Sequence, residues 1–170
     1  ITTSGLPIIR RNTVIVNGTS QNFGIYLDSV TGAKIDGNNV FSNGTGADNH
    51  ALVLNNTNST LVANNSFKSM GANGLGLVLT GVSKINVFYN NIFNGSNASI
   101  YVNTTLNNSF NASSTWFAPN IVGGAVIGGN FYSNRTGGYS DNCSDYDRNG
   151  FCDNALTIYS DGLGDTITKD

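Results

Sequence analysis

The stretch Leu61-Val62-Ala63-Asn64-Asn65-Ser66-Phe67 decides the fold of this chain, because it recurs. An asparagine returns every 26 residues, at Asn12, Asn38, Asn64 and Asn90, and the last three copies carry a second asparagine directly after it. Apolar residues lie three positions before and three positions after each copy: Ile9, Ile35, Leu61 and Val87, then Ile15, Phe41, Phe67 and Phe93. A repeat of this kind is typical of a solenoid, in which each coil buries its apolar face against the next.

A second series of apolar segments lies between these copies. Each member is a run of three aliphatic or aromatic residues: Ile25-Tyr26-Leu27, Leu52-Val53-Leu54, Leu77-Val78-Leu79 and Ile100-Tyr101-Val102. Short apolar runs broken by Gly and Asn indicate β-strands and leave no place for helices. We therefore predict an all-β fold, a right-handed, single-stranded parallel β-helix (a β-solenoid) of about 5–6 coils over residues 1–140. A β-sandwich would explain the strands but not the fixed repeat.

The repeating asparagines have a predicted structural role. Asn tolerates the left-handed backbone of a tight corner, and stacked Asn side chains bond to one another along a fibre or solenoid axis. We expect Asn12, Asn38, Asn64 and Asn90 to form such a ladder.

Composition excludes two classes of function. The chain has 170 residues, of which 28 are Asn and only 11% are charged, and its formal charge is −2. No basic patch is present to neutralise nucleic-acid phosphates, and no apolar run approaches the roughly 20 residues that span a bilayer. Seven of the ten Asp lie in residues 141–170, and this shift marks a second unit, an Asp-rich tail.

Two motifs give the chain a family resemblance. Asn120-Ile121-Val122-Gly123-Gly124 with Ile127-Gly128-Gly129-Asn130-Phe131-Tyr132-Ser133, and later Asp161-Gly162-Leu163-Gly164-Asp165, are similar to the closing coil and acidic end of NosD-like proteins. These belong to the carbohydrate-binding and sugar-hydrolase (CASH) superfamily of right-handed β-helix repeats, abundant in archaeal surface proteins. The resemblance implies the fold and a cell-surface location. Because the family includes enzymes, adhesins and structural parts, it leaves the function open.

The tail contains a motif typical of a calcium loop. Asp145, Asp147, Asn149, Phe151 and Asp153 occupy the ligand positions of an EF-hand-like loop, with Gly150 at its turn. Leu156 replaces the usual bidentate Glu, so further oxygens would have to come from Asp141, Asp161 or Asp165. We therefore predict structural calcium, although a solvated acidic turn would have a similar sequence.

Two cysteines, Cys143 and Cys152, bracket this loop. A pair so close together in a charge-poor β protein predicts a disulfide and an oxidising compartment. A zinc pair is the alternative, but the neighbourhood offers no other soft ligand.

Glycosylation sequons are more than twice as frequent as random placement of the Asn, Ser and Thr residues would give. Asn64 belongs to the corner repeat, whereas the remaining sequons predict N-glycans on surface loops: Asn17, Asn43, Asn55, Asn58, Asn94, Asn97, Asn103, Asn107, Asn111, Asn134 and Asn142.

Three functions compete on these residues. Catalysis is disfavoured because Asp28, Asp36 and Asp48 do not recur in register, although Asp28 could meet Lys34. Copper handling is disfavoured because the chain has one His and one Met. Glycan binding could use the aromatic residues Tyr26, Phe88, Tyr89, Tyr101 and Trp116.

The favoured prediction is a non-catalytic secreted protein that polymerises with itself into an extracellular filament or surface layer. Open β-helix ends invite pairing with another chain, and we find no capping helix before Ile8-Ile9. In place of a cap, residues 1–8 are expected to lie as a strand against a neighbouring subunit.

Overall fold

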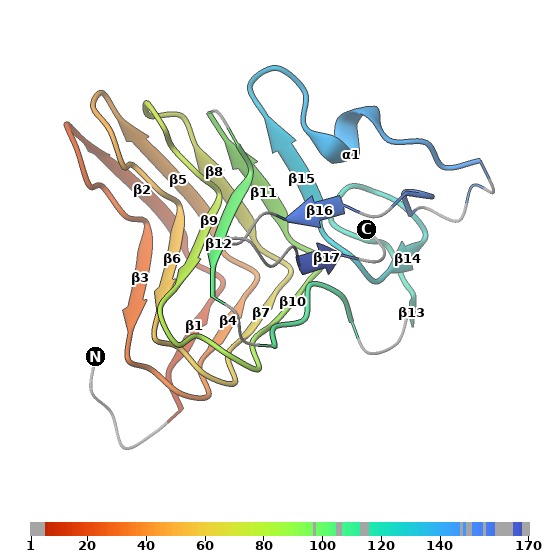
Figure 1. The fold of residues 1–170 in the computed structure, drawn as a ribbon, viewed down its shortest axis with the longest axis horizontal. Coiled ribbons are helices and arrows are strands. Elements are labelled where there is room, and N and C mark those ends of the chain that lie inside the picture. Colours follow the sequence, from red (N-terminus) through yellow and green to blue (C-terminus); the bar gives the residue numbers. More distant parts are fainter. Residues whose placement is uncertain are drawn as a thin grey trace.

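A computed structural model describes residues 6–96, 98–104, 107–112, 116–146, 148, 151–154, 156–158 and 165–167. Its body is a parallel β-solenoid with three faces, so the predicted fold class is confirmed (Figure 1). Each face is one parallel sheet, and successive strands of a sheet come from successive coils. The later segments of the chain gather at the end of the solenoid that lies far from the N-terminus (Figure 1).

The three sheets have four or five strands each. Sheet 1 contains β1 (Ile8–Arg10), β4 (Lys34–Asp36), β7 (Leu61–Ala63) and β10 (Val87–Tyr89). Sheet 2 contains β2 (Thr13–Gly18), β5 (Asn39–Gly44), β8 (Ser66–Ser69), β11 (Ile92–Gly95) and β15 (Phe131–Asn134). Sheet 3 contains β3 (Ile25–Asp28), β6 (Leu52–Asn55), β9 (Leu77–Thr80) and β12 (Ile100–Asn103). The solenoid thus has about four complete coils. The predicted 5–6 are not reached, because after β12 the described chain rejoins the coil path only at Ser109, which bridges to Val87, and at β15.

The strand register follows the predicted repeat with one slip. Ile9 pairs with Ile35 at a spacing of 26, but Ile35 pairs with Val62 rather than with Leu61. The segment from β5 to β6, residues 45–51, is one residue longer than the corresponding segment 19–24 of the first coil. Because strand side chains alternate between faces, a shift of one residue reverses which residues point inward. Val62 and not Leu61 is therefore fully buried.

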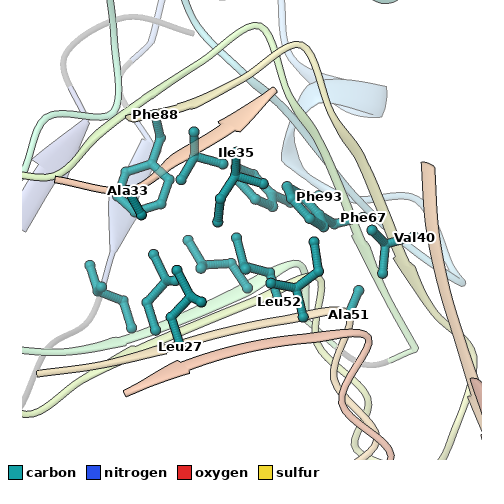
Figure 2. Close-up of a cluster of buried hydrophobic side chains, with 14 of the residues drawn as sticks. Leu27, Ala33, Ile35, Val40, Ala51, Leu52, Phe67, Phe88 and Phe93 are labelled. Carbon is teal, nitrogen blue, oxygen red and sulfur yellow. The ribbon is translucent and has the colours of Figure 1, made fainter. Parts of the chain in front are cut away.

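The same slip determines the aromatic core of sheet 2. Val14, Val40, Phe67, Phe93 and Tyr132 form one inward column, whereas Ile15 is 63% exposed. The rings of Phe67 and Phe93 stack at 5.6 Å and lie side by side among the buried aliphatic residues (Figure 2). Stacked rings on successive coils bury large apolar areas and add a directional contact beyond that burial.

A continuous amide ladder runs inside the corner between sheets 1 and 2. Each asparagine donates its backbone N–H and its Nδ2 to the Oδ1 of the asparagine in the following coil, at 2.8–3.2 Å. The members are Asn12, Asn38, Asn65, Asn91 and Asn130. Each Nδ2 from Asn38 onward also donates to a backbone carbonyl of the preceding coil. Buried corner backbone groups thereby find partners that a turn would otherwise leave unsatisfied.

The paired asparagines divide two tasks between them. Asn64 and Asn90, predicted as ladder members, lie one residue before the buried ladder and have left-handed φ angles of 59° and 53°. Arg11 and Gly37 hold the same left-handed corner position in the first two coils. Asn64 and Asn90 join an outer row in which Asn90 Nδ2 donates to Asn64 Oδ1 at 2.7 Å and Asn64 Nδ2 donates to Asp36 at 2.9 Å. The first asparagine therefore turns the chain and the second holds the coils together.

The segments after β12 add short elements at one end. β13 (Trp116–Phe117) and β14 (Val126–Ile127) pair antiparallel, as do β16 (Leu156–Ile158) and β17 (Asp165–Ile167). The four-residue helix α1 (Tyr139–Asn142) packs against β15. No helix in the part of the chain that the structure describes has the length and apolar character needed to cross a bilayer.

The division between the two asparagines predicts unequal effects of substitution. Asn65→Ala should lower the free energy of unfolding by about 3 kcal/mol, because it leaves buried N–H and carbonyl groups unpaired. Asn64→Gly preserves the left-handed corner and removes one exposed and one part-buried bond, so it should cost only about 1 kcal/mol. Urea unfolding of both variants measures the difference, and equal losses would contradict the assignment.

Candidate functional site

Two carboxylates of the predicted calcium site are engaged in hydrogen bonds with nearby residues. Asp141 Oδ2 accepts from Ser133 Oγ at 2.7 Å and from Gly138 N at 2.6 Å. Asp153 Oδ2 accepts from Tyr146 N at 2.8 Å. Asp147, Asn149 and Asp161 lie outside the described residues, and Asp165 begins β17. Among the residues that are described, no three His, Cys, Asp or Glu side chains gather in a group able to hold a metal ion.

The two cysteines form the predicted disulfide. Cys143 and Cys152 are joined, with their Cα atoms 5.6 Å apart. Cys152 is buried and Asp153 N donates to Ser144 O, so the bond closes a short loop beside α1. The prediction of a disulfide is confirmed, and the zinc alternative is excluded because neither thiolate is available.

The candidate catalytic carboxylates do not converge. Asp36 is paired with Arg10 at 3.0 Å, which is the single ion pair among the described residues. Asp28 accepts from the side chains of Asn55, Asn56 and Ser29, and no contact with Lys34 is present in the described chain. A general acid–base pair needs two such groups around one substrate atom, and this arrangement does not supply them.

The predicted sugar-stacking residues separate into buried and exposed groups. Phe88 is fully buried in the core and stacks on Phe110 at 4.8 Å, so it is unavailable to a ligand. Tyr26 and Tyr101 are exposed and occupy the two ends of one outward column of sheet 3, with Val53 and Val78 between them. Tyr89 lies half-buried in β10, and the side chain of Trp116 is outside the described part.

Sequence reasoning missed an aromatic row at the start of sheet 3. The ring of Phe23 stacks on Tyr26 at 5.6 Å and on His50, in the next coil, at 5.7 Å. His50 Nδ1 accepts a hydrogen bond from Leu75 N, which places the ring proton on Nε2. Burial lowers the pKa of His50 below its ordinary 6.5, and the nearby Asp48 carboxylate offsets this in part. The 27-residue spacing of Phe23 and His50 was the available signal.

In the part of the chain that the structure describes, the N-terminal end of the solenoid is an open edge. β1, β2 and β3 are the terminal strands of their sheets. The carbonyls of Asn12 and Gly18 accept from Asn39 N and Thr45 N, at 2.9 and 3.0 Å. A parallel strand uses every second residue for one neighbour, so the N–H and C=O groups of Thr13, Ile15 and Asn17 point to the free edge.

Two further observations distinguish this edge. Asn12 Oδ1, the first acceptor of the buried ladder, receives no donor from the described chain. Four of the exposed large apolar side chains also lie in this coil or just before it: Leu6, Ile8, Ile15 and Tyr26. Leu6–Ile8, the described part of the predicted strand-donating segment, run beside β4, where Pro7 O accepts from Lys34 N.

The opposite end is largely covered by the chain itself. Ser109 bonds to the edge of β10 by donating to Asn86 O and accepting from Phe88 N, both at 2.8 Å. Ser140 Oγ accepts from Tyr132 N at the edge of β15. The ladder ends at Asn130, whose Nδ2 donates to Phe88 O, Phe110 O and the Tyr132 hydroxyl. The edges of β10 and β15 are therefore covered at this end, whereas β12 is a terminal strand of sheet 3.

A cavity of about 250 Å³ lies at the covered end. Its walls come from residues 120–131, from α1 and from the disulfide loop, and include Ile121, Val126, Phe131 and Phe151. The Oδ1 of Asn90, which also lines it, accepts from Ile121 N at 2.8 Å. The cavity is a packing gap between the last coil and its cover, with no assembled set of catalytic groups.

The predicted glycosylation sites differ in exposure. Asn17, Asn43, Asn107 and Asn142 are exposed, whereas Asn55, Asn58, Asn94, Asn103, Asn111 and Asn134 are half-buried. Asn97 lies outside the described residues.

The lowered pKa of His50 predicts a pH dependence of stability. The imidazole of His50 binds a proton more readily in the unfolded chain than in the folded one. The contribution of His50 to the free energy of unfolding is therefore complete above pH 6.5, and it declines as the pH falls from there toward the folded pKa. Urea midpoints at pH 7 and pH 5 measure this loss. His50→Phe preserves the stacked row but cannot titrate, so its midpoint should change less between the two pH values. An identical change in both proteins would contradict the role of His50.

Comparison with known proteins identifies a family that this chain matches. The family model described as "Periplasmic copper-binding protein (NosD)" matches residues 2–137, which is most of the chain and all four coils. No curated protein and no solved structure matches this chain.

The prediction of structural calcium is wrong. The matching family is described as copper-binding, and the described residues hold no metal-binding group. The physical reason is that Asp141 and Asp153 are engaged by Ser133, Gly138 and Tyr146, so these carboxylates do not point to a common centre.

The described residues do not fit a copper site either. Copper in proteins is held by imidazole, thiolate and thioether groups. Both cysteines are oxidised, and the Nδ1 of His50 is occupied by Leu75 N. The extent of the family match, together with the four-coil solenoid that it covers, shows that the chain belongs to the NosD family of β-helix proteins.

Proposed function

We propose that this chain is a non-catalytic structural protein of the cell exterior or envelope, which associates with a second copy of itself through its N-terminal end. A disulfide supports an oxidising compartment, and the family is described as periplasmic. The absence of converging carboxylates among the described residues supports a structural role over catalysis.

The open first coil is the observation that best supports the proposed association. Its three edge strands present unpaired backbone groups, which readily add a further strand. Half-buried Ile9 and Val14 and buried Ile25 and Leu27 lie just behind this edge, so association would continue the core across the interface.

A second copy of this chain is the partner that fits the open N-terminal end. Its covered end has free edges on neither β10 nor β15 and only β12 as a terminal strand, so its own N-terminal end offers the larger matching surface. Identical surfaces that meet in this way form a closed two-fold pair. A continuous end-to-end filament or layer of stacked solenoids would instead require both ends to be open.

A proline in the edge strand tests this pairing. Ile15→Pro removes an outward N–H and leaves the bonds from β2 to β5 intact, which is the position where sheets tolerate proline. The dissociation constant of the pair should rise at least about tenfold, because two-fold symmetry removes the bond twice. Analytical ultracentrifugation measures the constant, and circular dichroism checks the fold.

Ile15→Ala is the matched control, since it removes the same exposed side chain and keeps the N–H. It should pair like the wild type. A wild-type chain that stays monomeric at high concentration, or that forms open filaments, would contradict the proposed pairing.

A glycan-binding module is the second candidate, favoured by the stack of Phe23 on the half-exposed Tyr26 beside the Asp28 carboxylate. Sugar rings stack on such faces while carboxylates bind their hydroxyls. Under this alternative, Tyr26→Ala should abolish binding to a glycan array and Tyr101→Ala should not. No binding by the wild type would remove the candidate.

A further inference from the structure

Two asparagines on sheet 2 have no structural task that the fold accounts for. Asn17 in β2 and Asn43 in β5 are paired in register, one coil apart. Both are exposed, and neither side chain has a hydrogen-bond partner among the described residues. Neither has the left-handed φ of the corner asparagines. Asn is depleted inside strands, so two unpartnered copies at matching positions call for another explanation.

The glycine and threonine that follow each of these asparagines have different explanations. Asn17-Gly18-Thr19 and Asn43-Gly44-Thr45 are the same triplet in adjacent coils. The glycines are explained by packing, because a Cβ on Gly18 or Gly44 would lie 2.3 or 2.2 Å from the side chain of Asn22 or Asn49. The two threonines are exposed like the asparagines. The asparagine and threonine of each triplet share one known pattern, Asn-x-Thr, which is an acceptor for N-glycans.

In three other sequons, the side-chain nitrogen Nδ2 of the asparagine donates hydrogen bonds within the fold. Nδ2 is the atom that an N-glycan modifies, and in Asn55 and Asn64 it donates to Asp28 and Asp36, at 3.0 and 2.9 Å. In the amide orientation that satisfies its neighbours, Asn58 Nδ2 donates to Val82 O and Thr57 O at 3.2 Å. Modification of these nitrogens would displace contacts between coils, whereas Asn17 and Asn43 lose nothing.

We propose that Asn17 and Asn43 are N-glycan acceptors, which make the outer face of sheet 2 at the first two coils a carbohydrate-bearing surface. Each transfer forms a bond between Nδ2 and the anomeric carbon of a sugar. The amide loses one proton, and the phosphate of an activated, phosphate-linked glycosyl donor leaves. This inference rests on the location outside the cytoplasm in the proposed function but not on association, so the two are tested separately.

Peptide mass spectrometry of the protein purified from its producing cells provides an internally controlled test. Trypsin cuts after Lys34 and Lys68, and the peptide between them carries Asn43 together with Asn55, Asn58 and Asn64. Electron-transfer fragmentation should place hexose or hexosamine mass on Asn43 and leave the other three unmodified. The peptide 12–34 should carry its glycan on Asn17, which is its one sequon.

Two variants at one exposed position complete the test. Thr45→Ala should eliminate the glycan from Asn43, whereas Thr45→Ser preserves the hydroxyl and should retain it. Both should fold, because Thr45 is exposed and its backbone bond to Gly18 O is unchanged. Unmodified wild-type peptides, or glycans on Asn55, Asn58 or Asn64 with none on Asn17 and Asn43, would overturn the proposal. Purified protein that is glycosylated but monomeric would support this inference and contradict the pairing alone.

Discussion

The rest of the solenoid depends on the buried amide ladder in the corner between sheets 1 and 2. A corner between two strands leaves backbone N–H and C=O groups without ladder partners, and their burial is costly unless they are bonded. Asparagine is the short side chain that carries both a donor and an acceptor. Repeated from Asn12 to Asn130, it satisfies these groups in every coil and fixes the register of one coil on the next.

The ladder also gives the molecule a direction. Every member donates toward the following coil, so the first leaves an acceptor and the last must find other partners for its donors. Asn130 finds them in Phe88 O, Phe110 O and the Tyr132 hydroxyl, because residues after β12 return over that end. Asn12 has no such cover among the described residues. The ladder therefore ends in a free acceptor at the first coil and in satisfied donors at the last, and the association that we propose would use the end with the free acceptor.

The sequence predicts much of the solenoid, and each prediction that is wrong has a physical cause. The 26-residue spacing located the coils, and the apolar triplets of sheet 3 pair at the predicted intervals. The sequence could not separate Asn64 from Asn65, because the choice depends on which residue takes the left-handed φ. One extra residue in segment 45–51 then reversed the burial of Leu61 and Val62. The calcium loop failed for a different reason: the motif does not reveal that Asp141 is already bonded to Ser133 and Gly138, which lie outside the motif.

Hydrogen–deuterium exchange at low and high protein concentration tests the central claim most directly, because it reads the edge amides themselves. If the first coil is the association surface, peptides that contain β1, β2 and β3 gain protection as concentration rises. Peptides from residues 107–112 and 131–142, at the covered end, exchange at the same rate throughout. Protection gained at the covered end, or no dependence on concentration, would contradict the account.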